Sequence, residues 1–209
     1  EISSRSDAIS KAVSELNSGD ILIVAGKGHE NYQEYKKRLF FSDKLEIIKA
    51  IRKKNNLLSN SLKTNILIET FNNKILNKKT LINLVSLNSK EVKKNSVFFG
   101  VKGQKFDGNK FGIEAIKNNA ILAITNKKSK NSRNIFSKNP FETLNKFSSI
   151  YRKSLDSNYI VITGSAGKTS VKDLTGFCLD KLDKTYYSKN SFNNKYGVPL
   201  SIINSPQST

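Results

Sequence analysis

A glycine-rich turn near the carboxyl end of the sequence has the residue types and spacing of a phosphate-binding loop. Its residues are Thr163, Gly164, Ser165, Ala166, Gly167, Lys168, Thr169 and Ser170. Such a turn at the start of a helix gathers backbone N–H groups around an anion, and the helix dipole adds positive potential. The pattern predicts that residues 164–170 bind phosphate groups, with the Lys168 ammonium on the outer phosphates and the Thr169 hydroxyl on Mg²⁺.

This loop is a shortened form of the P-loop pattern. Ile162 stands where the eight-residue pattern requires its first glycine, so that Gly-x-x-Gly-Lys-Thr remains. A glycine turn before a helix can also be purely structural. The apolar run in front of the turn and the Lys168-Thr169 pair behind it favour phosphate binding.

A second glycine turn lies at residues 25–30. It reads Ala-Gly-Lys-Gly-His-Glu and follows the apolar run 21–24. A carboxylate beside a tight turn can bind an ammonium while the backbone meets a carboxylate. The glycines alone would indicate only a turn. A single histidine such as His29 is more often a structural hydrogen-bonding group than a catalyst.

The elements around the second turn are those of an incomplete domain. Helical spacing of apolar residues at 9, 12, 13 and 16 predicts a helix, residues 21–24 a strand buried on both faces, and residues 45–51 another helix. One strand and two helices cannot bury their apolar faces alone, so we expect the end of a domain here. Residues 53–61 are polar at both ends and predict a linker.

The middle of the chain has the elements of a complete small α/β domain. Strands are expected at 81–87, 96–101 and 121–125, and helices at 111–119 and 141–155. Residues 127–138 are rich in Lys, Asn and Ser and predict a mobile loop. After them, residues 159–163 predict a further buried strand and Lys168 the start of a helix. The inner face of that helix is expected to carry Val171, Leu174, Cys178 and Leu182.

Composition restricts the class of protein. The 209 residues carry a formal charge of +19, almost all from lysine, with arginine only at five positions. Arginine is the preferred residue for bidentate phosphate and base recognition, so a lysine-rich solvated surface is favoured over a face that binds nucleic acid. The single Cys178 excludes an internal disulfide. With no long apolar run or basic leader, these features favour a cytoplasmic protein without membrane insertion.

Residues 163–170 resemble the ATP site of the Mur ligase family. The resemblance continues in residues 190–200 (Asn-Ser-Phe-Asn-Asn-Lys-Tyr-Gly-Val-Pro-Leu), which look like the family's second motif. The form of this motif with Asn193 and Asn194 resembles that of the D-alanyl-D-alanine-adding ligases. Residues 101–111 resemble a segment of the domain that holds the uridine nucleotide in those enzymes. Residues 86–90 depart from the family's Asp-Ser-Arg, because Ser89 is present but Asn88 and Lys90 replace its charged neighbours.

The first fifty residues resemble the carboxyl end of the diaminopimelate-adding Mur ligases. The matching features are Gly19-Asp20, the run 21–24, the turn 25–33 and Phe41-Ser42-Asp43. In that family the first glycine and the glutamate of Gly-Lys-Gly-His-Glu hold the amino-acid substrate, which here implies Gly26 and Glu30.

Together these resemblances imply part of a fused, bifunctional α/β ligase. Residues 1–52 would be a partial Rossmann-like end of the diaminopimelate-adding enzyme, 53–61 a linker, 62–156 the complete UDP-substrate domain and 157–209 the start of the P-loop ATPase-type central domain. The resemblance implies ATP and Mg²⁺ as cofactors, UDP-N-acetylmuramoyl peptides, diaminopimelate and D-alanyl-D-alanine as substrates, and a monomer. The implied catalytic residue is Lys168, and the implied substrate residues are Gly26, Glu30, Ser89, Asn193 and Asn194. The alternative is a non-catalytic basic module that binds nucleic acid or anionic membrane.

Overall fold

The structure, a computed structural model, describes residues 2–26, 32–34, 38–71, 75–104, 106–188 and 194–206. The chain divides into two units at Leu58/Ser59, inside helix α2 (Asp43–Phe71), so this helix supplies residues to both.

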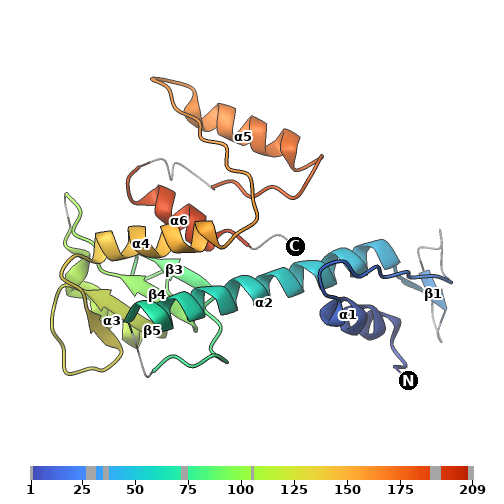
Figure 1. The fold of residues 1–209 in the computed structure, drawn as a ribbon, viewed down its shortest axis with the longest axis horizontal. Helices are drawn as coiled ribbons and strands as arrows, with labels where there is room; N and C mark the ends of the chain where they lie inside the picture. Colours follow the sequence, from blue (N-terminus) through green and yellow to red (C-terminus); the bar gives the residue numbers. More distant parts are fainter. Residues whose placement is uncertain are drawn as a thin grey trace. The chain divides into compact units, whose positions relative to one another are not determined.

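A four-stranded parallel sheet forms the centre of the larger unit (Figure 1). Its strands lie in the order of the sequence: β3 (Leu84–Ser86), β4 (Ser96–Phe99), β5 (Ala120–Thr125) and β6 (Asn134–Phe136). The three strands expected in the middle of the chain are confirmed, with β3 and β4 shorter than the apolar runs that predicted them.

Both faces of this sheet are covered, as parallel sheets require. Val97, Phe99, Leu122 and Ile124 point into one core, which they share with α4 (Pro140–Lys153), α6 (Gly197–Asn204) and the last part of α2. Their neighbours in sequence, such as Phe98 and Ala123, point into a second core with α3 (Gly112–Lys117). The alternation follows from the period of two along a strand. The sheet is therefore the middle layer of a three-layer α/β/α arrangement.

Helix α4 is confirmed within one or two residues of its expected bounds, and its start is encoded locally. The Asn139 side chain accepts a hydrogen bond from the Glu142 N–H, and Pro140 occupies the first turn, where its missing N–H costs nothing. The helix expected at 111–119 appears as a short 3₁₀ turn (η1, Gly108–Phe111) followed by α3.

Strand β6 corrects the expectation of a mobile loop over residues 127–138. Its placement depends on a buried amide rather than on apolar alternation. Asn134 accepts a hydrogen bond from the Thr125 hydroxyl (3.2 Å) and donates one to the Lys127 carbonyl (3.0 Å). The strand was not predicted because the segment is rich in polar residues, and polar contacts are what hold it in place.

The strand expected at residues 159–163 is not formed. These residues lie in no strand, and Ile160 and Val161 are 63 % and 86 % exposed. Helix α5 (Lys168–Leu179) begins as expected, but its expected inner face is open, with Leu174 65 % and Leu182 83 % exposed. A parallel strand needs neighbours on its edges, and within the described residues no segment pairs with 159–163.

Helix α6 is attached to the edge of the sheet. The Asn204 side chain accepts a hydrogen bond from the Val85 N–H (2.9 Å) and donates one to the Val85 carbonyl (2.8 Å). Ile203 is fully buried, and the Tyr151 hydroxyl donates to the Ser205 carbonyl at 2.7 Å. The amide thereby satisfies backbone groups of edge strand β3 that would otherwise be open to another strand.

The smaller unit contains α1 (Arg5–Glu15), the antiparallel pair β1 (Tyr32–Glu34) and β2 (Arg38–Phe40), and the first part of α2. Its core is Ile9, Val13 and Ala50. The expectation of a strand buried on both faces at 21–24 is wrong. Ile21 and Ile23 are 87 % and 83 % exposed, and only the alternate residues Leu22 and Val24 pack against the core.

The expected linker, residues 53–61, is helical and lies inside α2. The segment contains neither glycine nor proline, so nothing in it interrupts a helix. Lys54 adds a tertiary contact, because its ammonium donates to the Val13 carbonyl (3.2 Å) and to the Leu16 carbonyl at the end of α1. A cation on the last carbonyls of a helix stabilises that end. The division of the chain into domains stays a prediction.

Burial of Lys63 on α2 should make the stability of the chain depend on pH. Lys63 is 3 % exposed, with its ammonium 5.8 Å from the centre of the Tyr151 ring, and burial lowers its pKa from 10.5 to about 8. Between these values the unfolded chain binds the proton and the folded chain does not. The free energy of unfolding therefore rises with pH through this window. We expect a gain of roughly 2 kcal/mol between about pH 7.5 and pH 9.5, measured by urea unfolding.

The matched control is Lys63→Met, which keeps an unbranched side chain and removes the charge. The variant should be more stable than the parent near neutral pH and should lack the rise. Burial raises the pKa of Tyr151, Tyr159 and Tyr186 above 10.0, so these groups titrate above the window. An equal rise in the variant would assign the effect to other lysines.

Candidate functional site

The expected phosphate loop opens helix α5 at a glycine in the left-handed region. Gly167 is the N-cap residue of α5 with φ +75°, and no side chain caps the helix. The conformation, rather than a lack of space, requires glycine, because nothing lies within 4 Å of a Cβ built there. The first N–H groups of an α-helix have no partner inside the helix. An uncapped start of this kind can bind an anion.

The ammonium of Lys168 is folded back onto its own loop. It donates to the carbonyl oxygens of Gly164 and Ser165, the second at 3.3 Å. The charge therefore already lies over the turn, and it would exchange carbonyl oxygens for phosphate oxygens when an anion binds. Thr169 and Ser170 follow in the first turn of α5. In the described part of the chain, no three His, Cys, Asp or Glu side chains gather as metal ligands. A role of Thr169 in binding Mg²⁺ stays a prediction.

Helix α5 also fixes the segment that leads to the second expected motif. The Lys172 ammonium donates to the Ser188 carbonyl and pairs with the Asp173 carboxylate at 2.8 Å. The Tyr187 ring lies directly on Gly176, where a Cβ would come within 2.4 Å of the ring. These contacts were not predicted from the sequence. A glycine inside an apolar helical pattern was the available signal.

Of the second motif, Asn193 lies outside the described residues, and Asn194 has a structural contact. The Asn194 side-chain oxygen accepts hydrogen bonds from the N–H groups of Tyr196 (3.0 Å) and Gly197 (2.8 Å), which begins α6. The Tyr196 hydroxyl donates to the Lys102 carbonyl at 3.1 Å, so the motif contacts the loop that follows β4. The substrate roles of Asn193 and Asn194 stay predictions.

Ser89 lies in the loop after β3, at the carboxyl edge of the sheet, and is 6 % exposed. Its hydroxyl donates to the Glu114 carboxylate (2.9 Å), and its carbonyl accepts from the Asn118 side chain (3.0 Å). These bonds hold the loop against α3. Its neighbour Asn88 donates to the Glu91 carboxylate at 3.0 Å. A substrate role for Ser89 stays a prediction.

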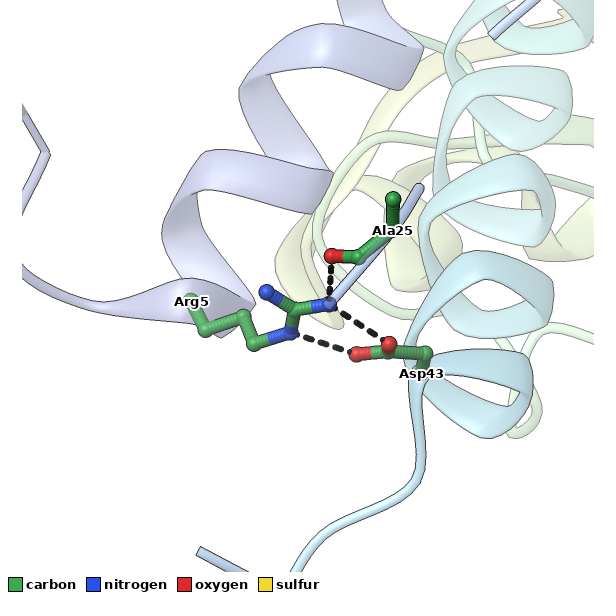
Figure 2. Close-up of polar contacts among 3 residues, drawn as sticks. All are labelled: Arg5, Ala25 and Asp43. Atoms are coloured by element: carbon green, nitrogen blue, oxygen red, sulfur yellow. Dashed lines mark hydrogen bonds and ion pairs between the residues drawn. The ribbon is translucent and has the colours of Figure 1, made fainter. Parts of the chain in front are cut away.

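A bidentate arginine contact lies beside Ala25, the residue before Gly26 (Figure 2). The Arg5 guanidinium donates to both carboxylate oxygens of Asp43, each at 2.7 Å, and to the Ala25 carbonyl at 2.8 Å. The hydrogen bond with Asp43 raises the pKa of Arg5. Gly26 follows with φ +104°, whereas Glu30 and His29 lie outside the described residues. This pair was not predicted from the sequence, because its members are 38 residues apart.

Comparison with known proteins identifies the relatives of these elements. Residues 81–152 match the model of the Mur ligase family, catalytic domain. The chain is 32 % identical over 124 residues to the UDP-N-acetylmuramoyl-tripeptide–D-alanyl-D-alanine ligase of Buchnera aphidicola, covering 59 % of this chain and 27 % of the relative. It is 42 % identical over 93 residues to the UDP-N-acetylmuramoyl-L-alanyl-D-glutamate–2,6-diaminopimelate ligase of Rickettsia typhi, covering 43 % and 19 %. The chain is homologous to the Mur ligases.

Solved structures agree with the fold of this Mur ligase homologue. The MurF ligase of Thermotoga maritima, crystallised with ADP, matches 60 % of this chain at 35 % identity and a TM-score of 0.53. MurF from Acinetobacter baumannii matches 68 % at a TM-score of 0.59 and 22 % identity, which shows the fold alone. The chain spans 30 % and 32 % of these two proteins, and 27 % and 19 % of the two ligases above.

The family match of the Mur ligase homologue covers the sheet and α4 and ends before the loop at 163–170. The assignment of the loop therefore depends on its sequence and on the start of α5. Among the described residues, the helices are too short or too polar to cross a membrane.

Proposed function

We propose that this chain is part of a bifunctional, ATP-dependent ligase of cytoplasmic peptidoglycan-precursor synthesis. It would add diaminopimelate and then D-alanyl-D-alanine to UDP-N-acetylmuramoyl peptides. The observation that carries the proposal is that one chain is homologous both to a diaminopimelate-adding and to a D-alanyl-D-alanine-adding ligase. The products of the first enzyme type are the substrates of the second, so a fused polypeptide is chemically reasonable.

In the second reaction, the terminal carboxylate of the UDP-linked tripeptide attacks the γ-phosphorus of ATP and ADP leaves. The amine of D-alanyl-D-alanine then attacks the acyl phosphate, and inorganic phosphate leaves as the amide forms. The backbone at Gly164 and Gly167 and the Lys168 ammonium would stabilise charge on the phosphates, and Thr169 would help to hold Mg²⁺. The uncapped start of α5 supports this arrangement.

The remaining parts have separate roles in this proposal. Residues 62–156 would hold the UDP-linked substrate, at the carboxyl edge of the parallel sheet where open α/β folds bind ligands. Residues 157–209 would begin the ATP-binding domain, and Gly26 and Glu30 would hold diaminopimelate. We propose that the 209-residue chain by itself binds nucleotide and forms no amide bond.

Replacement of Lys168 tests the phosphate loop. Lys168→Ala should weaken the binding of Mg-ATP by roughly 1.5–3 kcal/mol, about 10- to 100-fold, the range for a charge-assisted contact. Isothermal titration calorimetry measures the affinity with and without Mg²⁺. The matched control Lys181→Ala removes the same charge beyond the end of α5 and should bind like the parent. Equal affinities of Lys168→Ala and the parent, both folded, would refute the assignment.

The charge of +19 favours one second candidate, a basic module for nucleic acid or anionic membrane. Binding of that kind releases counterions, so the affinity falls steeply as salt rises and does not depend on Lys168. Titration with duplex DNA and with anionic vesicles at two salt concentrations distinguishes it from nucleotide binding.

A further inference from the structure

The loops after β4 and β5 meet at the carboxyl edge of the sheet in very close packing. The loop after β4 turns back on itself. Lys102 and Asp107 form an isolated antiparallel β-bridge, and the Gly108 N–H donates to the Val101 carbonyl at 3.0 Å. A Cβ on Gly108 would lie 2.6 Å from that carbonyl oxygen, and one on Gly100 would lie 2.9 Å from Thr125 at the end of β5. Both positions therefore accommodate only glycine at this packing distance.

One side chain joins these loops. Asn109 is 4 % exposed, and its amide nitrogen donates to the Asp107 carboxylate at 2.7 Å. Its amide oxygen accepts from the Asn126 N–H, in the loop after β5, at 2.8 Å. The Asn109 backbone N–H donates to the same Asp107 oxygen at 3.1 Å. The two ends of the amide thus have different functions, since the nitrogen donates to the carboxylate and the oxygen accepts from the N–H.

The charges around this contact suit an anionic ligand. Lys110 and Lys127 are exposed, and both act on Asp107. The hydrogen bond from Asn109 is the main cause that lowers the pKa of the Asp107 carboxyl, with smaller contributions from Lys127 and Lys110. Because Asn109 occupies an oxygen of Asp107, part of the negative charge at this edge is compensated within the protein.

We propose that Asn109 is a positioning residue for the nucleoside diphosphate part of the substrate. It holds the β4 and β5 loops at a fixed separation and keeps the Asp107 carboxylate in the contact between them. This inference rests on the proposed role of residues 62–156 as the UDP-substrate domain. Asn109 itself acts through the loops and not by touching the ligand.

The test compares Asn109→Asp and Asn109→Ala in the full chain, with UDP as the probe. At pH 7.5, N109D places a second carboxylate against Asp107, and UDP affinity should fall about tenfold or more. At about pH 5 the two carboxyls share a proton, the donor returns, and affinity should recover towards that of the parent at the same pH. Asn109→Ala should bind weakly at both pH values. The charged groups that face the pair are Asp107, Lys110 and Lys127.

Controls separate positioning from folding. Asn119→Asp makes the same charge change in an exposed turn before β5, at the opposite end of that strand, and should bind UDP like the parent. Mg-ATP affinity should be unchanged in all variants. Loss of UDP affinity that follows melting temperature, without recovery at low pH, would overturn the positioning role, as would unchanged affinity in N109D. Absence of UDP binding by the parent would overturn both the inference and the proposed substrate domain, leaving the ATP loop to be judged by Lys168→Ala.

Discussion

Phe147→Ala should lower the free energy of unfolding by about 4 kcal/mol, the cost of deleting a large buried side chain and leaving a cavity. Phe147 is fully buried in α4, and its ring stacks on that of Phe99 in β4 with centroids 6.3 Å apart. The contact joins the helical layer to the sheet, so its loss affects the whole larger unit. Urea unfolding followed by circular dichroism measures the change.

Val161→Ala is the contrasting control. Val161 is 86 % exposed and lies in no strand, so this substitution should change stability by less than about 0.5 kcal/mol. The apolar run 159–163 instead predicted a buried strand at this position, which would make the substitution costly. A large loss in Val161→Ala would show that residues 159–163 are buried after all.

The second large effect is expected at the carboxyl end of the described chain. Ile203→Ala should cost about 3 kcal/mol, because Ile203 is fully buried in the same core as Phe147. Hydrogen exchange gives a direct readout. The amides of α6 should be slow in the parent and fast in the variant, in contrast to residues 1–60, which we expect to exchange quickly.

Val198→Ala provides the comparison on the same helix, since Val198 is 51 % exposed. It should leave both stability and exchange of α6 nearly unchanged. If Ile203→Ala were also neutral, α6 would not be docked on the sheet. The boundary expected at residues 156–157 would then separate two regions that unfold independently.

The sequence alone predicted three of the four strands of the central sheet. Residues 97–99 and 120–124 form continuous apolar runs, which favour strands buried on both faces at this length. Helix α4 was predictable for a similar reason, because its cap, its first-turn proline and its apolar period are local. The glycine pattern likewise located the start of α5 at Lys168.

Local sequence patterns gave wrong predictions where strand pairing or polar contacts decide the structure. The runs 21–24 and 159–163 have strand composition, but a strand exists only where a neighbour satisfies its backbone, and no described segment does so. Conversely, β6 lies in a polar stretch and forms because the Asn134 side chain makes hydrogen bonds with Thr125 and Lys127.

The sequence by itself determined which residues are candidates for chemistry, since the expected phosphate loop, the glycine at position 26 and the family resemblance all follow from residue types at short spacing. Only the tertiary structure decided how those residues are held. Arg5 meets Asp43 and Ala25, and Asn109 meets Asn126, across separations from 17 to 38 residues. Short-range patterns encode the local backbone, whereas hydrogen bonds between distant side chains depend on how the whole chain packs.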